Sequence, residues 1–386
     1  MSTAHAAPIA AFRSDTYVMQ GDPAESRLST YHLILAGTHA CNLRCRHCYL
    51  PDHDTGALAE TTALGLVDQW SRIVERECGG KNGIFHVKGG EPLVIPYFRR
   101  LMNRVLTAGN LHLMLTTNGT LGSARLFEDF AAYNRTASGE LTVIVSLDGA
   151  VQASHELLRG HNQFRKTIDF VQNLAQRGIR TFLNCVLHSA NFREAEEYLD
   201  LAARLGVRQV NFLPLVPKGF GQDIQHQQVP HLQLHRHLDS IYHRVASPIR
   251  DLMAGSLSHI MDRAHRGVSP AHECTAGYRG LFYIAPDGNA YTCPNITNPS
   301  FSLGNVNVET LTDIMGRLGS LRAQIKAHSE YGDGYICAGE RLLYEGRRDD
   351  ANFNNLVQLQ SHCDEQLAAT KTQSNTERAY CVSRNF

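Results

Sequence analysis

Six short apolar runs, each followed by a segment of helical periodicity, fill residues 31–215 of this 386-residue chain. The helical segments repeat apolar residues three and four positions apart, as in Leu66, Val67, Trp70 and Ile73. Alternation of this kind favours a parallel sheet with helices packed on its outside. Strands are therefore predicted at residues 31–36, 84–88, 111–116, 141–146, 180–187 and 208–214.

Three cysteines follow directly after the first of these strands. Cys41, Cys45 and Cys48 have the spacing C-x₃-C-x₂-C. Thiolates so close along one loop can wrap a corner of an iron–sulfur cube, whose irons prefer soft sulfur ligands. A closed cube takes four cysteines, and no fourth lies nearby in sequence, which leaves one iron open for a small molecule. The alternatives are a zinc knuckle or three free thiols, although zinc fingers usually come as paired Cys or Cys/His sets.

This motif resembles that of the radical S-adenosylmethionine (radical SAM) superfamily. The resemblance implies that a [4Fe–4S] cluster on the three cysteines chelates S-adenosylmethionine and cleaves its sulfonium. The 5′-deoxyadenosyl radical so formed then abstracts a substrate hydrogen. The expected fold class is α/β: a partial (β/α)₆ TIM-like barrel, with the active site at the carboxyl ends of its strands.

Two further motifs follow the second and third predicted strands and are similar to those of the family. Gly89, Gly90 and Glu91 belong to a Gly-Gly-Glu-Pro motif. Glycines let a backbone approach a ligand closely, and the resemblance implies that the motif binds the methionine amino group. Asn118 belongs to a Thr-Asn-Gly-Thr motif and is expected to hydrogen-bond the cofactor or the substrate.

The next motifs follow the fourth strand and lie on the fifth. Ser146 and Asp148 belong to Ser-Leu-Asp-Gly, and their family equivalents lie at the ribose or the substrate. Arg159 ends an H-x₃-R-G element, where a charge-assisted bond to the methionine carboxylate is expected. Asn184 is expected at the ribose or the carboxylate. Any one of these motifs alone is more often a simple turn; five in family order, each at a strand end, favour the radical SAM interpretation.

A second group of cysteines begins with Cys274. A predicted hairpin follows, with Gly288 in a Pro-Asp-Gly-Asn turn and Cys293 at its far end. This spacing resembles the opening of the auxiliary-cluster domain called SPASM, or Twitch in its shorter form. The chain lacks the dense cysteine run with which a complete SPASM domain continues, so a small, degenerate α+β version is expected.

The number of late cysteines limits the number of auxiliary clusters. Two closed four-thiolate sites need eight cysteines, whereas five are present. We therefore predict one auxiliary [4Fe–4S] cluster, with Cys381 either a spare thiol or the true fourth ligand. The alternative is that the five are unrelated thiols. The predicted ligands are Cys274, Cys293, Cys337 and Cys363.

The resulting domain plan has four parts. An N-terminal extension occupies residues 1–30, the radical SAM barrel 31–215, a bridging region 216–272 and the degenerate SPASM/Twitch domain 273–386. No catalytic side chain is assigned, although Asp148 and Cys381 are considered for that role.

Composition excludes several classes of protein. Lys plus Arg and Asp plus Glu both number 37, so there is no basic excess of the kind that binds nucleic acid. No apolar run approaches the ~20 residues that span a bilayer, and the N-terminus does not read as a secretory signal. A cytoplasmic enzyme is therefore expected, in which ten cysteines serve metal binding or chemistry rather than disulfides.

Enzymes that pair these two domains mostly mature ribosomally made peptides, so a net oxidation such as a crosslink in a precursor peptide is the preferred function. An external one-electron reductant of flavodoxin or ferredoxin type is then expected as a partner. The 40 residues before Cys41 are too few for a winged-helix leader-binding domain, which weakens the peptide interpretation. The alternatives are a dehydrogenase or epimerase of small molecules such as sugars, and a formylglycine-type protein maturase. An electron carrier is disfavoured, because it needs no methionine-binding groups.

Overall fold

The computed structural model describes residues 31–53, 56–80, 83–136, 141–253 and 281–318. Within it, six parallel strands alternate with helices. All six predicted strands are confirmed, with ends that differ by at most one residue from those expected. The strands are β1 (Tyr31–Ala36), β2 (Gly83–Lys88), β3 (Leu111–Thr117), β4 (Leu141–Ser146), β5 (Arg180–Leu187) and β6 (Gln209–Pro214).

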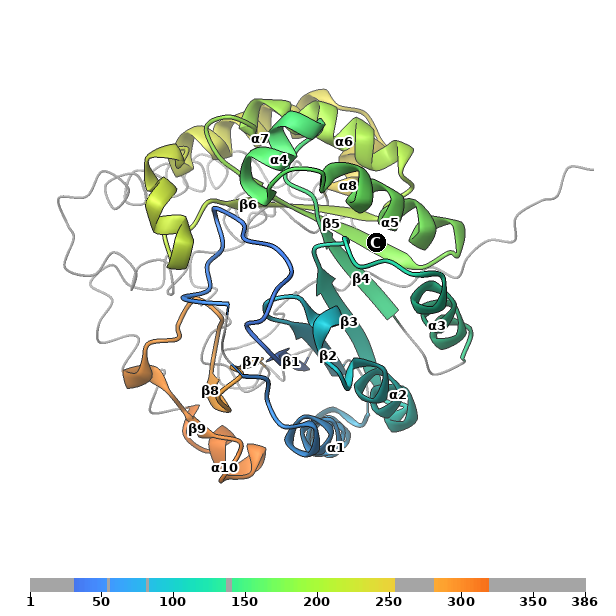
Figure 1. Cartoon of the computed structure of the whole chain (residues 1–386), viewed down its shortest axis with the longest axis vertical. Coiled ribbons are helices and arrows are strands. Elements are labelled where there is room, and N and C mark those ends of the chain that lie inside the picture. Colours follow the sequence, from blue (N-terminus) through green and yellow to red (C-terminus); the bar gives the residue numbers. More distant parts are fainter. Residues whose placement is uncertain (1–30, 54–55, 81–82, 137–140, 254–280, 319–386) are drawn as a thin grey trace, which may run out of the picture.

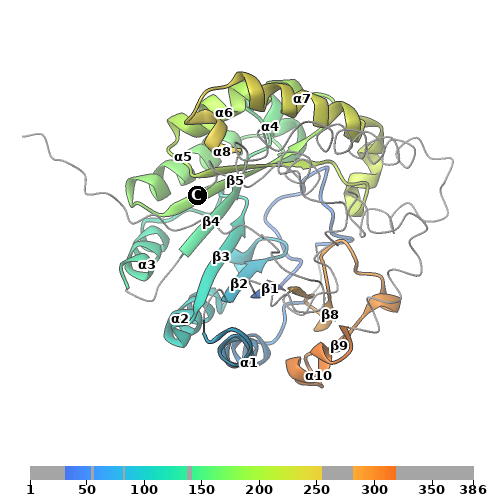
Figure 2. The ribbon, with the colours of Figure 1, turned by 180° about the vertical axis from the view of Figure 1, so that it is seen from behind.

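The helices of this part lie along the outer side of the strands, and both views show this arrangement (Figure 1, Figure 2). Trp70 shows why α1 packs there: its ring is fully buried and its Nε1 donates to the carbonyl of Ile84 on β2 at 2.9 Å. The α-helices are α1 (Glu60–Cys78), α2 (Phe98–Ala108), α3 (Ala124–Arg135), α4 (Gln152–Arg159), α5 (Phe164–Gln176), α6 (Ala195–Arg204), α7 (His231–Arg244), α8 (Ile249–Leu252) and α10 (Leu311–Met315).

Within the described residues the sheet is open and has nine strands in the order β6-β5-β4-β3-β2-β1-β7-β8-β9. The predicted hairpin is confirmed as antiparallel strands β7 (Leu281–Ile284) and β8 (Asn289–Tyr291), which β9 (Gly304–Asn305) extends. The hairpin does not form a sheet of its own. Strand β7 pairs in parallel with β1, because the backbone groups on that side of β1 would otherwise have no strand partner.

The two faces of the parallel sheet differ in polarity. Outward-facing residues such as Leu33, Phe85 and Leu113 are fully buried in one core with the helices. Alternate residues face the inner side, and several are polar: His86 bonds Thr116 across β2 and β3 at 2.7 Å. Because side chains alternate along a strand, the same strands build an apolar core on one side and a polar lining on the other. The loop that follows β1 lies on that inner side (Figure 1).

Candidate functional site

The loop with Cys41, Cys45 and Cys48 is held by backbone bonds to three distant segments. Its own turn is closed by the Cys48 amide, which donates to the Cys45 carbonyl at 3.1 Å. Arg46 N–H donates to the carbonyl of Leu158 on α4 at 2.8 Å, and the Gly221 amide donates to the carbonyl of Cys48 at 3.2 Å. The Gly-Gly-Glu-Pro motif supplies the third attachment. The loop is therefore placed by its neighbours.

The Gly-Gly-Glu-Pro motif lies directly against the start of this loop. The Gly90 amide donates to Thr38 O at 2.8 Å, and the Glu91 amide donates to Ala40 O at 2.9 Å. A Cβ on Gly90 would lie 2.1 Å from Ala40 O, and one on Gly89 would lie 2.4 Å from Thr38 O. The glycines were expected to let backbone approach a ligand; in the structure the backbone that they approach is that of the cysteine loop.

Replacing Gly90 by Ala is expected to displace the cysteine loop, because the backbone oxygen of Ala40 cannot share the volume of a Cβ. Overpacking of this kind costs about 1–3 kcal/mol, and iron bound by the reconstituted protein should fall with it. Gly65→Ala is the matched control: Gly65 lies within α1 with no atom within 4 Å of its Cβ position. That variant should be more stable by about 0.5–1 kcal/mol. Iron content and thermal unfolding measure both effects, and a Gly90→Ala protein with unchanged iron would contradict this account.

Glu91 is completely buried, and both carboxylate oxygens accept hydrogen bonds from the protein. Oε1 accepts from Leu93 N at 3.1 Å and from Thr117 Oγ1 at 2.7 Å, and Oε2 accepts from Asn118 N at 2.8 Å. Burial raises the pKa of Glu91, and these three bonds oppose that rise. The carboxylate thus ties β2 to the end of β3, and its expected contact with a methionine ammonium stays a prediction.

Asn118 carries this connection on to the first cysteine. Its side-chain amide donates to Asn42 Oδ1 at 2.9 Å and approaches Cys41 Sγ at 3.8 Å. Its Oδ1 accepts from both the backbone and the hydroxyl of Thr120, which closes the Thr-Asn-Gly-Thr turn. Asn118 is 6% exposed. In the structure it positions the cysteine loop, and a contact with cofactor or substrate remains expected.

Asp148 and Arg159 form a buried ion pair beside the second cysteine. Arg159 Nε donates to Asp148 Oδ2, and its Nη1 lies 3.9 Å from Cys45 Sγ. The other oxygen, Asp148 Oδ1, accepts from the Val186 amide at 2.8 Å. Burial alone would raise the pKa of Asp148, but Arg159, His47 and other neighbours lower it to about 2. Arg159 was expected to meet the methionine carboxylate; here it joins a carboxylate of the protein to a cysteine.

His47, between Cys45 and Cys48, was not singled out from the sequence. Its Nε2 lies 3.3 Å from Asp148 Oδ2. Its Nδ1 is buried and has no hydrogen-bond partner in the part of the chain that the structure describes. Burial lowers the pKa of His47 to about 4, with Asp148 opposing the shift. The available signal in the sequence was a titratable side chain between two predicted ligands, at a position that the spacing of the cysteines does not specify.

Ser146 and Asn184 lie opposite each other in the register of β4 and β5. The next strand adds Asn211, whose amide donates to Asn184 Oδ1 at 2.7 Å and whose own oxygen accepts from Gln209 at 2.7 Å. Ser146, Asn184 and Asn211 form a polar row across β4, β5 and β6, level with the last residue of β4. Ser146 and Asn184 were predicted to bind cofactor. Asn211 was missed; the available signal was a polar residue inside the sixth predicted strand, as Asn184 is inside the fifth.

The cysteine loop fits the expected iron–sulfur cluster in the chemistry of its donors. Burial raises the pKa of all three thiols, that of Cys45 to about 12, with Arg159 opposing the rise at each. Such thiols ionise only when a cation compensates them, and iron would do so. Among the described residues, no three His, Cys, Asp or Glu side chains gather closely enough for one metal ion. In an iron–sulfur cube each thiolate binds a different iron, so the three sulfurs need not lie close enough to share one metal ion.

Cys293 is the member of the late cysteine group that falls within the described residues. It follows β8, and its sulfur accepts from the Asn295 amide at 3.4 Å. The segment after it is joined to residues 216–221 by Lys218, whose ammonium donates to Pro294 O at 3.0 Å and to Thr297 Oγ1 at 2.7 Å. The other predicted late ligands lie outside the described residues, as does residue range 1–30; they are Cys274, Cys337 and Cys363, together with Cys381.

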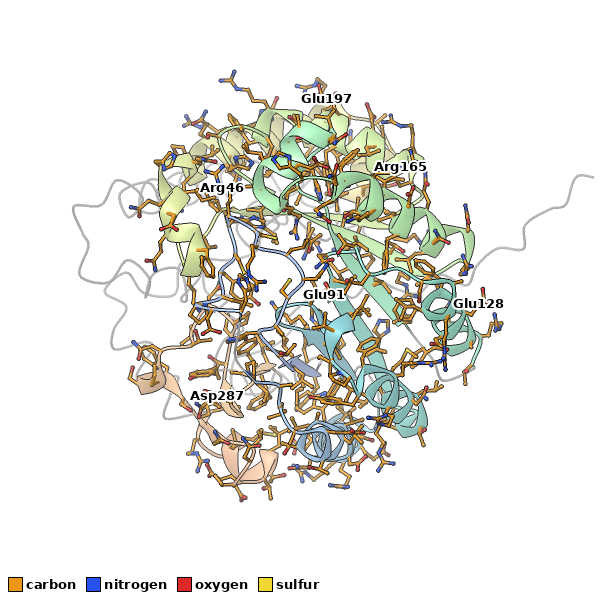
Figure 3. The ribbon with its side chains drawn as sticks, viewed as in Figure 1. Arg46, Glu91, Glu128, Arg165, Glu197 and Asp287 are labelled. Carbon is orange, nitrogen blue, oxygen red and sulfur yellow. The ribbon has the colours of Figure 1, made fainter. Side chains whose placement is uncertain are left out.

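The cysteine loop and the motifs that contain Glu91, Asn118, Asp148 and Arg159 therefore meet at one place, whereas other charged groups lie at the periphery. Figure 3 shows Glu91 near the middle of the molecule, and Glu128, Arg165 and Glu197 on its outer helices. The structure brings Cys41 and Cys45 together with Asn118 and Arg159. No helix among the described residues combines the length and apolar character needed to cross a bilayer.

Comparison with known proteins agrees with this geometry. Residues 35–202 match the model of the radical SAM superfamily. The mycofactocin maturase MftC of Mycobacterium tuberculosis is 29% identical over 279 residues, which cover 70% of this chain and 66% of MftC. The antilisterial bacteriocin subtilosin biosynthesis protein AlbA of Bacillus subtilis is 26% identical over 280 residues, which cover 71% of this chain and 57% of AlbA.

A solved structure shares the fold. That of native anSMEcpe with bound AdoMet and Cp18Cys peptide superposes with a TM-score of 0.64 at 16% identity, covering 89% of this chain and 100% of that one. The chain spans about two thirds of the length of MftC and a smaller part of AlbA. Residues 35–202, which hold the cysteine loop and the motifs around it up to Asn184, thus match the radical SAM superfamily, in a chain that is similar over about 70% of its length to MftC and AlbA.

Proposed function

We propose that this protein is a radical SAM enzyme that oxidises a ribosomally made precursor peptide, by a crosslink or a similar change. The observation that carries this proposal is the convergence of Asn118 and Arg159 on the sulfurs of Cys41 and Cys45, at 3.8 and 3.9 Å. Homology to MftC and AlbA supports a peptide as the substrate.

When bound, a [4Fe–4S] cluster on Cys41, Cys45 and Cys48 and S-adenosylmethionine together supply a 5′-deoxyadenosyl radical that abstracts a hydrogen atom. The amide of Asn118 and the guanidinium of Arg159 donate toward the ligand sulfurs, and hydrogen bonds to sulfur tune the potential of such clusters. Asp148 fixes Arg159 and keeps its charge compensated. Residues proposed for methionine and ribose binding are Gly89, Gly90, Glu91, Asn118, Ser146, Asp148, Arg159 and Asn184.

The oxidation needs an acceptor for the second electron. We assign this role to one auxiliary [4Fe–4S] cluster on Cys274, Cys293, Cys337 and Cys363, in the degenerate SPASM/Twitch region 273–386. Cys293 directly precedes Pro294, which Lys218 bonds, and Gly221 of the same short segment bonds the cysteine loop. This connection supports the assignment. An external one-electron reductant of flavodoxin or ferredoxin type would supply the electron that starts each turnover.

Turnover in D₂O tests the proposal, with peptides encoded by short reading frames next to the gene as substrates. Each event should remove one hydrogen atom, one proton and one electron, so the product is lighter by two hydrogens. One 5′-deoxyadenosine should form per event, and mass spectrometry measures both. The reaction without reductant is the control.

A product whose mass is unchanged after turnover in H₂O, and that carries one solvent deuterium after turnover in D₂O, would contradict the proposal. It would mean that a thiol, for example that of Cys381, returns a hydrogen atom to the substrate, as in epimerisation. If a sugar or another small molecule is modified and none of the peptides is, the proposed class of substrate is wrong.

A further inference from the structure

Lys88 is the last residue of β2 and precedes the two glycines of the Gly-Gly-Glu-Pro motif. Phe85 and Val87 of the same strand are fully buried in the outer core, so Lys88 belongs with His86 on the inner, polar face of the sheet. Its ammonium lies over the ring of Tyr49, 5.3 Å from the centroid. Tyr49 directly follows Cys48, so Lys88 stands at the edge of the cysteine loop.

This ammonium has no carboxylate partner among the described residues. No Asp or Glu oxygen of that part lies within 4.0 Å of Lys88 Nζ, whereas the comparably placed Arg159 is paired with Asp148. Its described contact, the Tyr49 ring, supplies only a weak cation–π attraction. Burial lowers the pKa of Lys88, and the thiol of Cys293 opposes that shift. A bound anion would reverse that shift, because opposite charge favours the ionised ammonium.

A second ammonium adds to the positive charge of this region. Lys218 is fixed by neutral acceptors, Pro294 O and Thr297 Oγ1. Burial lowers its pKa to about 8; the thiol of Cys293 opposes this shift and Lys88 adds to it. The two lysines are therefore close enough to repel each other. Two lysine ammonium groups therefore lie in the region between Tyr49 and Cys293.

We propose that Lys88 binds a carboxylate of the substrate, an Asp or Glu side chain or the C-terminal group of the peptide, and so positions it beside the cysteine loop. This inference rests on the proposed function. A carboxylate is the anion that a peptide carries, and a single compact ammonium recognises it as a point charge. Tyr49, against the ammonium, would pack on the neighbouring part of the bound residue. The methionine carboxylate of S-adenosylmethionine is the competing ligand, which Arg159 is expected to hold.

The experiment uses the full chain, anaerobically reconstituted and loaded with S-adenosylmethionine. The probes are two pools of N-acetylated hexapeptides that are otherwise identical, one with glutamate and a free C-terminus, the other with glutamine and a C-terminal amide. Affinity selection, measured by mass spectrometry, should retain about ten to one hundred times more of the acidic pool than of the amide pool. This ratio corresponds to the free energy of one charge-assisted hydrogen bond. Lys88→Met should abolish that preference, and Lys88→Arg should keep most of it. Lys166→Met, at an exposed position on α5, is the control and should change nothing.

Three outcomes would overturn the assignment. The first is a wild-type protein that does not prefer the acidic pool, and the second is a Lys88→Met protein that does. The third is a Lys88→Met protein whose affinity for S-adenosylmethionine or iron content falls by the same factor, since Lys88 would then serve a cofactor.

A competition arm separates the sources of the carboxylate. If glutarate displaces the acidic peptides at equal concentration and glutaramide does not, the site binds free acids, and the peptide part of the inference fails. If turnover modifies no peptide and the Lys88-dependent acid preference persists, the proposed peptide substrate is wrong while the carboxylate site stands.

Discussion

A protein in which Cys41, Cys45 and Cys48 are all replaced by Ala is expected to lose S-adenosylmethionine cleavage completely. It should also lose about half of its iron, because one of two proposed four-iron clusters would have no ligands. Asn118 and Arg159 approach the sulfurs of Cys41 and Cys45 as hydrogen-bond donors. Such donors do not take the place of a thiolate as a ligand of iron. Release of 5′-deoxyadenosine under reducing conditions and a colorimetric iron assay measure the two losses.

Cys78→Ala is the control for general thiol loss. Cys78 ends α1, and its thiol donates to Val74 O at 3.0 Å, away from the site. This variant should keep both its iron and its activity. Cleavage by the triple variant would refute the cluster assignment. A wild-type protein with about four irons would instead show that the late cysteines hold no cluster.

Much of the fold was predictable because its strands carry a local signal. Apolar runs such as residues 111–116 and 141–146 stand between helical segments, and the Pro-Asp-Gly turn before Asn289 marks a hairpin. What the local pattern does not contain is the partner of each element. The pairing of β7 with β1 depends on which strand edge remains open after six strands have assembled, and this is a property of the whole sheet.

The site shows the same division between residue identity and residue contact. The cysteines and motif residues are recognisable by spacing, but spacing does not say that Glu91 accepts from Asn118 or that Arg159 pairs with Asp148. Both pairs join segments that meet only in the folded chain. Lys88 was visible in the sequence beside the glycines, yet its significance lies in the absence of a carboxylate near it among the described residues.

The ion pair of Asp148 and Arg159 leads to the second large expected effect. Asp148→Ala should lower the free energy of unfolding by about 3–5 kcal/mol, because it leaves the buried guanidinium of Arg159 without its counter-charge. It also removes the acceptor for the Val186 amide. The pair is largely shielded from solvent, so added salt should screen little of its contribution. Urea denaturation of the reconstituted protein, followed by circular dichroism, measures the change.

Removing both charges separates the ion pair from general damage to the site. In the double variant Asp148→Ala, Arg159→Met no buried charge is left uncompensated, so it should be more stable than Asp148→Ala alone, with a coupling energy of about 1–3 kcal/mol. Asp169→Ala is the matched control, because Asp169 pairs with Arg165 on the exposed surface of α5, where an ion pair contributes little. If the two single substitutions simply add in the double variant, Asp148 does not act by holding Arg159. Arg159 would then have to be kept beside Cys45 by other contacts.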